Sequence, residues 1–221
     1  SNGKMGNDHS GAPSISADGR FVAFQSLASN LATEDKNGAS DVFIHDRKTG
    51  ETKIVSKDSA GVLGNGHSGA PAISADGRFV AFESTSSNLV TGDTNNKSDI
   101  FIHDRQTGRT SSTSRDSAGE LGNNDSYAPT TSADGRYVAF HSSATNLVQG
   151  DTNGLTDVFV HDLQTGETKL VSKDSAGALG NNYSYDPAIS ADGRYVAFRS
   201  RADTLVPSDT NGKDDVFVHD R

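Results

Sequence analysis

Hydrophobic and polar residues alternate along short stretches of the chain, with a period of two residues. In residues 136–142, for example, Val138 and Phe140 alternate with Ala139 and His141. Gly, Asp and Asn bound these stretches, as is typical of strands joined by tight turns. No stretch repeats its apolar residues with the period of about 3.6 that marks an amphipathic helix. The pattern therefore predicts an all-β protein with almost no helix.

The same pattern recurs in four copies, 58 residues apart. No insertion or deletion separates the copies, and self-similarity at a fixed period indicates a repeat architecture. We therefore divide this single domain into repeats at approximately 1–58, 59–116, 117–174 and 175–221. The landmarks that keep the period are the Asp-Gly-Arg tripeptides beginning at Asp18, Asp76, Asp134 and Asp192, the prolines Pro13, Pro71, Pro129 and Pro187, and the histidines His45, His103, His161 and His219.

Each full repeat predicts four strands. In the third repeat these strands cover residues 129–133, 136–142, 157–162 and 167–173. An Asp-Gly turn joins the first two, which is a strong hairpin signal, and a turn containing Gly166 joins the last two. Antiparallel four-stranded units stacked in series predict a β-propeller in which each repeat is one blade. A β-solenoid is the alternative, but solenoid repeats are shorter.

The fourth repeat is shorter than the others. Arg221 aligns with Leu163, so the equivalent of a fourth strand is missing. The last blade should therefore have three strands, with residues 215–220 as an open edge that can template association. Either the segment belongs to a longer propeller, or two chains pair into a larger ring, for example one of eight blades. In both cases we expect self-association at high concentration.

Two segments of each repeat carry a recognisable motif. Residues 187–198 contain Pro-x-x-Ser-x-Asp-Gly followed by a strand that ends in Ala-Phe, and residues 215–220 form a strand of the type Asp-Val-Phe-Val-His-Asp. In the other repeats a Thr-Gly turn follows, at Thr49, Thr107 and Thr165. These features resemble the TolB-like, WD-type family of β-propeller repeats. The resemblance implies a propeller and an extracellular or periplasmic location. It implies little about function, because members are mostly binding scaffolds or appendages to enzymes.

These repeats exceed the roughly 40–45 residues usual for such units. The extra residues fall in two connections, represented by 143–156 and 174–186 in the third repeat. Both connections lie at the same end of an antiparallel blade, which defines a long-loop face. Binding residues concentrate on loops held by a rigid scaffold, so this face is the candidate site for a protein or carbohydrate ligand. Alternatively, the loops only pack on one another around Leu31, Leu89, Leu147 and Leu205.

The first long connection of each repeat ends in Asp-x-Asn-Gly-x-x-Asp. It resembles the latter part of calcium loops, in which Asp and Asn oxygens surround a Gly at a sharp bend. Three side-chain donors would need carbonyl oxygens and water to reach the roughly six to eight ligands of calcium. The alternative is turn chemistry, in which Asp and Asn close Asx-turns. The motif residues are Asp35, Asn37 and Asp41; Asp93, Asn95 and Asp99, with Asn96 in place of Gly; Asp151, Asn153 and Asp157; and Asp209, Asn211 and Asp215.

A few positions differ between the copies. Gly11 and Gly69 become Tyr127 and Tyr185 in the later repeats, and Tyr183 lies beside the latter. Tyrosines can stack on sugars or on protein side chains, which makes these three the candidate ligand-binding residues, although they can also fill space between loops. Another position varies so widely that we expect it to be exposed. Its residues are Gln25, Glu83, His141 and Arg199.

The repeated histidines do not suggest a shared metal site. They lie on the predicted third strand, two strands from the inner one, which is about 10 Å at roughly 4.8 Å per strand. Zinc needs ligand nitrogens about 2 Å away, so we expect imidazoles that are bonded within or between blades.

Composition limits the function further. The 221 residues include 20 Lys plus Arg and 29 Asp plus Glu, and the net charge of −9 argues against a nucleic-acid backbone or an anionic membrane as partner. No apolar run approaches the roughly 20 residues that span a bilayer. The sequence contains no Gly-x-Ser-x-Gly elbow, His-Glu-x-x-His motif, phosphate loop or cysteine. We therefore expect a non-catalytic binding scaffold with no catalytic residues. The alternatives are the scaffold domain of a larger secreted hydrolase and a purely structural repeat protein.

Overall fold

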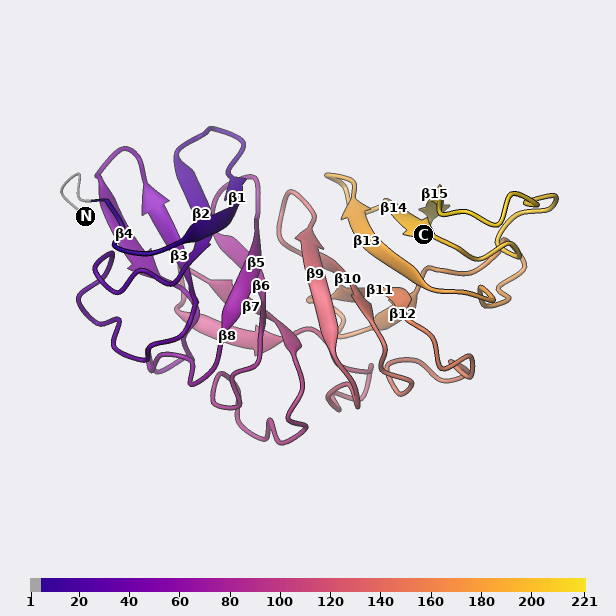
Figure 1. Ribbon diagram of the computed structural model, residues 1–221, viewed down its shortest axis with the longest axis horizontal. Coiled ribbons are helices and arrows are strands. Elements are labelled where there is room, and N and C mark those ends of the chain that lie inside the picture. The colour runs from indigo at the N-terminus through magenta and orange to yellow at the C-terminus, as the bar shows by residue number, and fades with distance from the viewer. Residues whose placement is uncertain (1–4) are drawn as a thin grey trace.

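The computed structural model describes residues 5–221, whose strands form four antiparallel sheets. Each sheet takes its strands from one repeat, and the sheets follow one another as the blades of a propeller (Figure 1). Within a blade the strands lie in chain order, and the first strands of successive blades contact one another. The predicted β-propeller architecture is therefore confirmed. In residues 5–221 no helix has the length and apolar character needed to cross a membrane.

The strands of the blades are as follows. Blade 1 contains β1 (Ser10–Ile15), β2 (Phe21–Ser26), β3 (Asp41–Asp46) and β4 (Glu51–Ile54). Blade 2 contains β5 (Ser68–Ile73), β6 (Phe79–Ser84), β7 (Asp99–Asp104) and β8 (Arg109–Ser112). Blade 3 contains β9 (Ser126–Thr131), β10 (Tyr137–Ser142), β11 (Asp157–Asp162) and β12 (Thr168–Leu170). Blade 4 has three strands, β13 (Ser184–Ile189), β14 (Tyr195–Ser200) and β15 (Asp215–Asp220), with β15 at the edge of the sheet, as the sequence predicts.

The innermost strand of each blade begins earlier than the sequence pattern predicts. In blade 3, β9 starts at Ser126, ahead of the predicted start at Pro129. Ala128 adopts a φ of 50°, and the register between β9 and β10 shifts at this point, so a β-bulge precedes the proline. A sheet tolerates proline at a bulge, which is why the strand continues through Pro129 instead of beginning there.

Each inner blade buries apolar side chains on both faces. One face carries a stacked pair of phenylalanines from the second and third strands, such as Phe140 and Phe159, whose ring centroids are 5.9 Å apart. The other face carries branched residues such as Val158 and Val160, which pack against Val196 of blade 4. A single blade cannot cover these faces itself, so the packing of neighbouring blades forms the core.

The four blades form an open arc, with blades 1 and 4 on opposite sides (Figure 1). Val216 and Val218 on β15 are 75% and 67% exposed, whereas their counterparts on β11 are almost fully buried against blade 4. At the other end of the arc, Ile15 of blade 1 is 57% exposed, and its counterpart Ile73 is 9% exposed. Both terminal blades therefore present an apolar face of the kind that the neighbouring blade covers elsewhere in the arc.

Candidate ligand-binding site

The bulges of the four innermost strands meet near the axis of the arc. Each bulge consists of a residue with positive φ followed by a proline, and together they line a cavity of about 330 Å³. The repeat thus brings the same backbone feature of every blade to one place. The lining residues are Ala12, Pro13, Ala70, Pro71, Ala128, Pro129, Asp186 and Pro187.

In blades 1 and 2, a side chain from the second strand reaches the bulge of the next blade. Gln25 Oε1 accepts a hydrogen bond of 2.9 Å from the backbone N–H of Ala70, and Glu83 Oε2 accepts one of 3.1 Å from Ala128. Burial raises the pKa of Glu83. The expectation that this position is exposed is wrong in these blades, because the next blade contacts it. The contacting bulge lies 45 residues further along the chain, so the sequence does not reveal the contact.

The equivalent residues of blades 3 and 4 make different contacts. The Nδ1 atom of His141 is buried and has no hydrogen-bond partner within residues 5–221. Burial lowers the pKa of His141, and the negative charge of Asp186 acts in the opposite direction. In blade 4, Arg199 lies 3.3 Å from Asp186 and 3.7 Å from Asp214. Beside the later two bulges, His141 therefore keeps an unpartnered nitrogen, and Arg199 forms ion pairs within its own blade.

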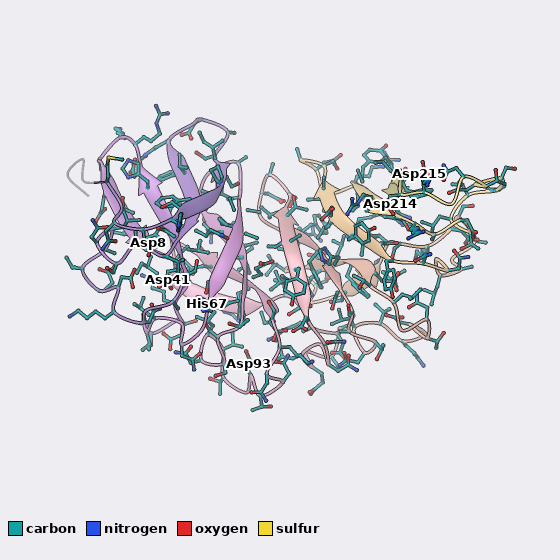
Figure 2. All side chains as sticks on the ribbon, in the orientation of Figure 1. Asp8, Asp41, His67, Asp93, Asp214 and Asp215 are labelled. Carbon is teal, nitrogen blue, oxygen red and sulfur yellow. The ribbon has the colours of Figure 1, made fainter. Side chains whose placement is uncertain are left out.

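Two of the candidate tyrosines lie in the same region. Tyr127 on β9 is paired with His141 on β10, and their ring centroids are 6.0 Å apart. Tyr185 on β13 is paired with Arg199 on β14, whose guanidinium lies 4.2 Å from the centroid of the Tyr185 ring. The Tyr185 hydroxyl donates a hydrogen bond of 3.1 Å to Asp214, which lies near Asp215 in the last blade (Figure 2).

The third tyrosine extends this surface toward the loops. Tyr183 immediately precedes β13 and is 50% exposed, and Tyr127 is 41% exposed. At the positions of Tyr127 and Tyr185, blades 1 and 2 have Gly11 and Gly69. Near the axis of the arc, blades 3 and 4 therefore differ in chemistry from blades 1 and 2. We call the half formed by Tyr127, Tyr183, Tyr185, His141 and Arg199 the tyrosine half.

In blades 1 to 3, hydrogen bonds hold the asparagine and the final aspartate of each Asp-x-Asn-Gly-x-x-Asp loop. In blade 3, Asn153 Nδ2 donates to Asp157 at 2.8 Å, and Asn153 Oδ1 accepts from the N–H of Leu155 at 2.8 Å. The Ser172 hydroxyl donates to the other oxygen of Asp157 at 2.6 Å. The same contacts recur in blades 1 and 2. These contacts are the turn chemistry that was the alternative to a calcium site.

The first aspartate of the loop is in a different situation. Asp151 is 7% exposed, and neither of its carboxylate oxygens has a hydrogen-bond partner in the described chain. Asp35 of blade 1 is 6% exposed and has one such oxygen. Burial, reinforced by the nearby charge of Asp157, raises the pKa of Asp151 to about 6. A buried carboxylate without a donor or a cation is unfavourable, so a cation would be most favourable beside this residue.

The loops offer separate sites. Asp41, Asp93 and Asp215 lie in three different blades, and Asp215 lies at the opposite end of the arc from Asp41 (Figure 2). Among residues 5–221, no cluster of three or more His, Cys, Asp or Glu side chains is placed to hold a metal ion. Any cation would therefore take most of its ligands from amide and carbonyl oxygens and from water.

The repeated histidines are structural in blades 2 and 3, as the sequence predicts. His103 Nδ1 lies 2.9 Å from the Thr110 hydroxyl, which donates to the backbone carbonyl of Lys57 in blade 1. His161 and Thr168 repeat the contact in blade 3. Burial lowers the pKa of both histidines to about 4, so the imidazoles are neutral at pH 7.

No family model and no curated protein sequence matches the chain. Similar solved structures include TolB from Acinetobacter baumannii, with 20% identity and a TM-score of 0.58 over 96% of this chain and 41% of that chain. A putative TolB from Agrobacterium tumefaciens has 19% identity and a TM-score of 0.55 over 93% and 59% of the two chains. The β-propeller domain of the trilobed protease from Pyrococcus furiosus has 13% identity and a TM-score of 0.56 over 97% and 55%. The chain thus spans between 41% and 59% of these three chains, and the likeness lies in the arrangement of the blades. The chain has the TolB-like β-propeller fold.

Proposed function

We propose that the protein is a non-catalytic propeller scaffold that binds a protein or carbohydrate ligand at the tyrosine half, where the innermost strands meet the long-loop face. The observation that supports this is the difference between otherwise similar blades. Tyr127 and Tyr185 stand where blades 1 and 2 have Gly11 and Gly69, and the exposed Tyr183 stands where blades 1 and 2 have histidines. Tyrosine supplies a large apolar ring with a polar end and is typical of binding surfaces.

Binding to an array of glycans and to a displayed peptide library tests this proposal. We expect one of the two to yield a ligand whose affinity falls about tenfold or more in a Tyr127→Ala, Tyr183→Ala double variant, because hot-spot aromatic residues contribute roughly 2 kcal/mol or more each. The matched control is Tyr195→Ala, which removes a tyrosine that is 40% exposed outside this surface. A ligand that binds the double variant and the control equally well would contradict the proposed site.

We further propose that the long loops bind calcium beside the first aspartate of the motif. The support is Asp151, a buried carboxylate with two unpartnered oxygens next to the second carboxylate of Asp157. Calcium would neutralise this charge and take further oxygens from Asn153, from backbone carbonyls and from water. Because the hydrogen bonds of Asn153 and Asp157 preform the turn, only the first aspartate would lack a partner in the absence of the ion.

Added calcium is expected to raise the melting temperature at pH 7.5, since a ligand present at 100 times its Kd stabilises the native state by about 2.7 kcal/mol. This gain should disappear as the pH falls below about 6, because the raised pKa of Asp151 leaves the carboxyl protonated there. Without calcium, the dependence of stability on pH is the opposite. A folded-state pKa of about 6, above the ordinary aspartate value of 3.8, means that the contribution of Asp151 to stability increases as the pH falls from about 7 to about 4.

The variant Asp151→Asn separates the two interpretations. It removes a buried charge and should not destabilise the protein in chelator, yet it should reduce the calcium-dependent gain. Asp209→Asn, at the more exposed equivalent position in blade 4, is the control and should change the gain less. An unchanged melting temperature in calcium, with no metal in the purified protein, would support turn chemistry alone.

The other hypotheses from the sequence stay predictions. The scaffold role in a larger secreted hydrolase and the extracellular or periplasmic location both follow from family resemblance, and the shared fold leaves them open to test.

A further inference from the structure

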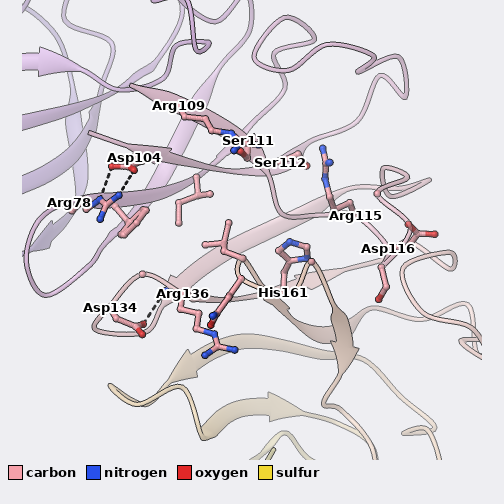
Figure 3. Close-up of a pocket in the computed structure, with 18 of the residues that line it drawn as sticks. Arg78, Asp104, Arg109, Ser111, Ser112, Arg115, Asp116, Asp134, Arg136 and His161 are labelled. Carbon is pink, nitrogen blue, oxygen red and sulfur yellow. Dashed lines mark hydrogen bonds and ion pairs between the residues drawn. The ribbon is translucent and has the colours of Figure 1, made fainter. Parts of the chain in front are cut away.

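A second cavity, of about 700 Å³, lies between blades 2 and 3 (Figure 3). It is lined by the outermost strand β8 and the following loop of blade 2, and by turns and strand β11 of blade 3. No residue of the tyrosine half lines it. The volume falls within the roughly 300–1,000 Å³ typical of small-molecule sites.

The cavity adjoins the strand at which blade 2 departs most from the repeat. In blade 1 the outermost strand carries an ion pair of 3.1 Å between Lys53 and Glu51, and blade 3 repeats this pair. Blade 2 has Arg109 in place of the glutamate and Ser111 in place of the lysine. The strand therefore loses its only carboxylate and a long side chain, which leaves both space and positive charge.

Two arginines of the cavity have no ionic partner in residues 5–221. Arg78 and Arg136 line the cavity but are paired with Asp104 and Asp162, each at 2.7 Å. Arg109 and Arg115 make no such pair. The Nε atom of Arg115 is in addition buried and lacks a hydrogen-bond partner. A guanidinium in this situation is incompletely satisfied, because it is always charged and offers five N–H donors.

The remaining carboxylates of the cavity already accept hydrogen bonds within their own turns. Asp116 accepts hydrogen bonds from the N–H groups of Ala118 and Glu120 at 2.9 and 2.8 Å. Asp134 accepts from the Ser132 hydroxyl at 2.6 Å and from the N–H of Arg136 at 3.0 Å. Neither carboxylate is ion-paired with Arg109 or Arg115, so these two side chains keep their capacity for an external anion.

We propose that this cavity binds a small organic anion whose phosphate or carboxylate group is held by Arg109 and Arg115. The planar guanidinium fork matches both groups and forms strong, charge-assisted hydrogen bonds to them. The hydroxyl of Ser111 adds a donor, and Phe79 and Leu163 offer apolar surface to the organic part of the ligand. His161 also lines the cavity and is neutral at pH 7, so it does not add charge.

Titration calorimetry with phenyl phosphate and benzoate tests this inference, with phenol as the uncharged control. At least one of the two anions should bind, and phenol should not. Binding of phenyl phosphate alone identifies a phosphate site, and binding of benzoate alone identifies a carboxylate site. If neither anion binds, or if phenol binds as well as they do, the proposal is wrong.

The decisive variant is Arg109→Glu combined with Ser111→Lys, which gives blade 2 the ion pair that blades 1 and 3 already carry. It should fold, because the same residues are accommodated twice in this chain, and it should weaken anion binding about tenfold or more. The control is Lys53→Ser at the same position in blade 1, which should leave the affinity unchanged. Equal affinity in the double variant would overturn the proposal.

A spectroscopic measurement localises the anion. A bound negative charge favours the imidazolium form, so the NMR titration of His161 should shift upward from its pKa of about 4 when the anion is present. The equivalent His103, which lies between blades 1 and 2, should not shift. A change at both histidines, or at neither, would place the anion elsewhere.

Discussion

Replacing Gly135 by alanine is expected to reduce the free energy of unfolding by about 2–5 kcal/mol, whereas the same change at Gly19 should reduce it by about 1–2 kcal/mol. Both glycines occupy the Asp-Gly turn of their blade with nearly the same positive φ, 73° and 69°. The left-handed conformation disfavours a Cβ at both positions by about 1–2 kcal/mol. The difference between the two losses in the free energy of unfolding therefore measures the cost of the clash with the neighbouring blade.

The neighbour matters because each inter-blade contact places an aromatic ring on this glycine. A Cβ added at Gly135 would overlap Cδ2 of Phe79 in blade 2, so that the ring or the turn would have to move. At Gly19, in the first blade, the nearest atom belongs to the Arg47 side chain at 3.6 Å. The same approach recurs at Gly77 and Gly193, which meet Phe21 and Tyr137.

Chemical denaturation of both variants, followed by circular dichroism, gives the two values. If Gly135→Ala and Gly19→Ala cost the same, the aromatic ring rearranges without loss, and the turn glycine is required for backbone conformation alone. A larger loss at Gly19 would contradict the inter-blade packing described above.

The protein is expected to self-associate as its concentration rises, through the apolar faces at the two ends of the arc. Val216 and Val218 are 75% and 67% exposed on the face that blades 1 to 3 cover with the next blade. Ile15 is 57% exposed on the opposite face of blade 1, where the counterpart Ile73 of blade 2 packs against the preceding blade. Because a following blade packs on a preceding one in the same way throughout the arc, blade 1 of a second copy fits blade 4 of the first. The edge strand β15 adds unpaired backbone groups that favour the same contact.

Sedimentation velocity over a wide concentration range tests the association. Val218→Asp should weaken it more than about tenfold, since an unpaired charge in a buried apolar contact is strongly unfavourable. The matched control is Val62→Asp, which alters a valine that is 55% exposed in the loop between blades 1 and 2 and should leave the association intact. A monodisperse monomer at high concentration would exclude this interface.

The sequence alone determined the architecture. The fixed period of 58 residues, the Asp-Gly turns and the two-residue alternation predict strands whose bounds in β10 and β11 closely match the structure. These signals are local, because pleating and turn chemistry depend on neighbouring residues. The same reasoning predicts the three-stranded last blade and the structural imidazole of His103.

Contacts between blades were decided by the tertiary structure. Gln25 and Glu83 vary in sequence like surface residues, yet they accept hydrogen bonds from a bulge 45 residues away. The sequence does not indicate this bulge, because the residue with the left-handed conformation is an alanine and not a glycine. Variation between copies therefore indicates exposure only where no later blade covers the position.

For the candidate sites too, the sequence shows the residue types and only the structure shows their partners. The loop motif and the tyrosines are visible in the sequence as residue types, but only the structure separates the hydrogen-bonded Asp157 from the unpartnered Asp151. The change to Arg109 and Ser111 is equally visible in the sequence, and only the packing of blade 2 on blade 3 turns it into a cavity. Sequence determines which groups a blade carries, because the period fixes their positions within it. Packing determines which of those groups remain without a partner, because the partners come from a different repeat or from across the loop.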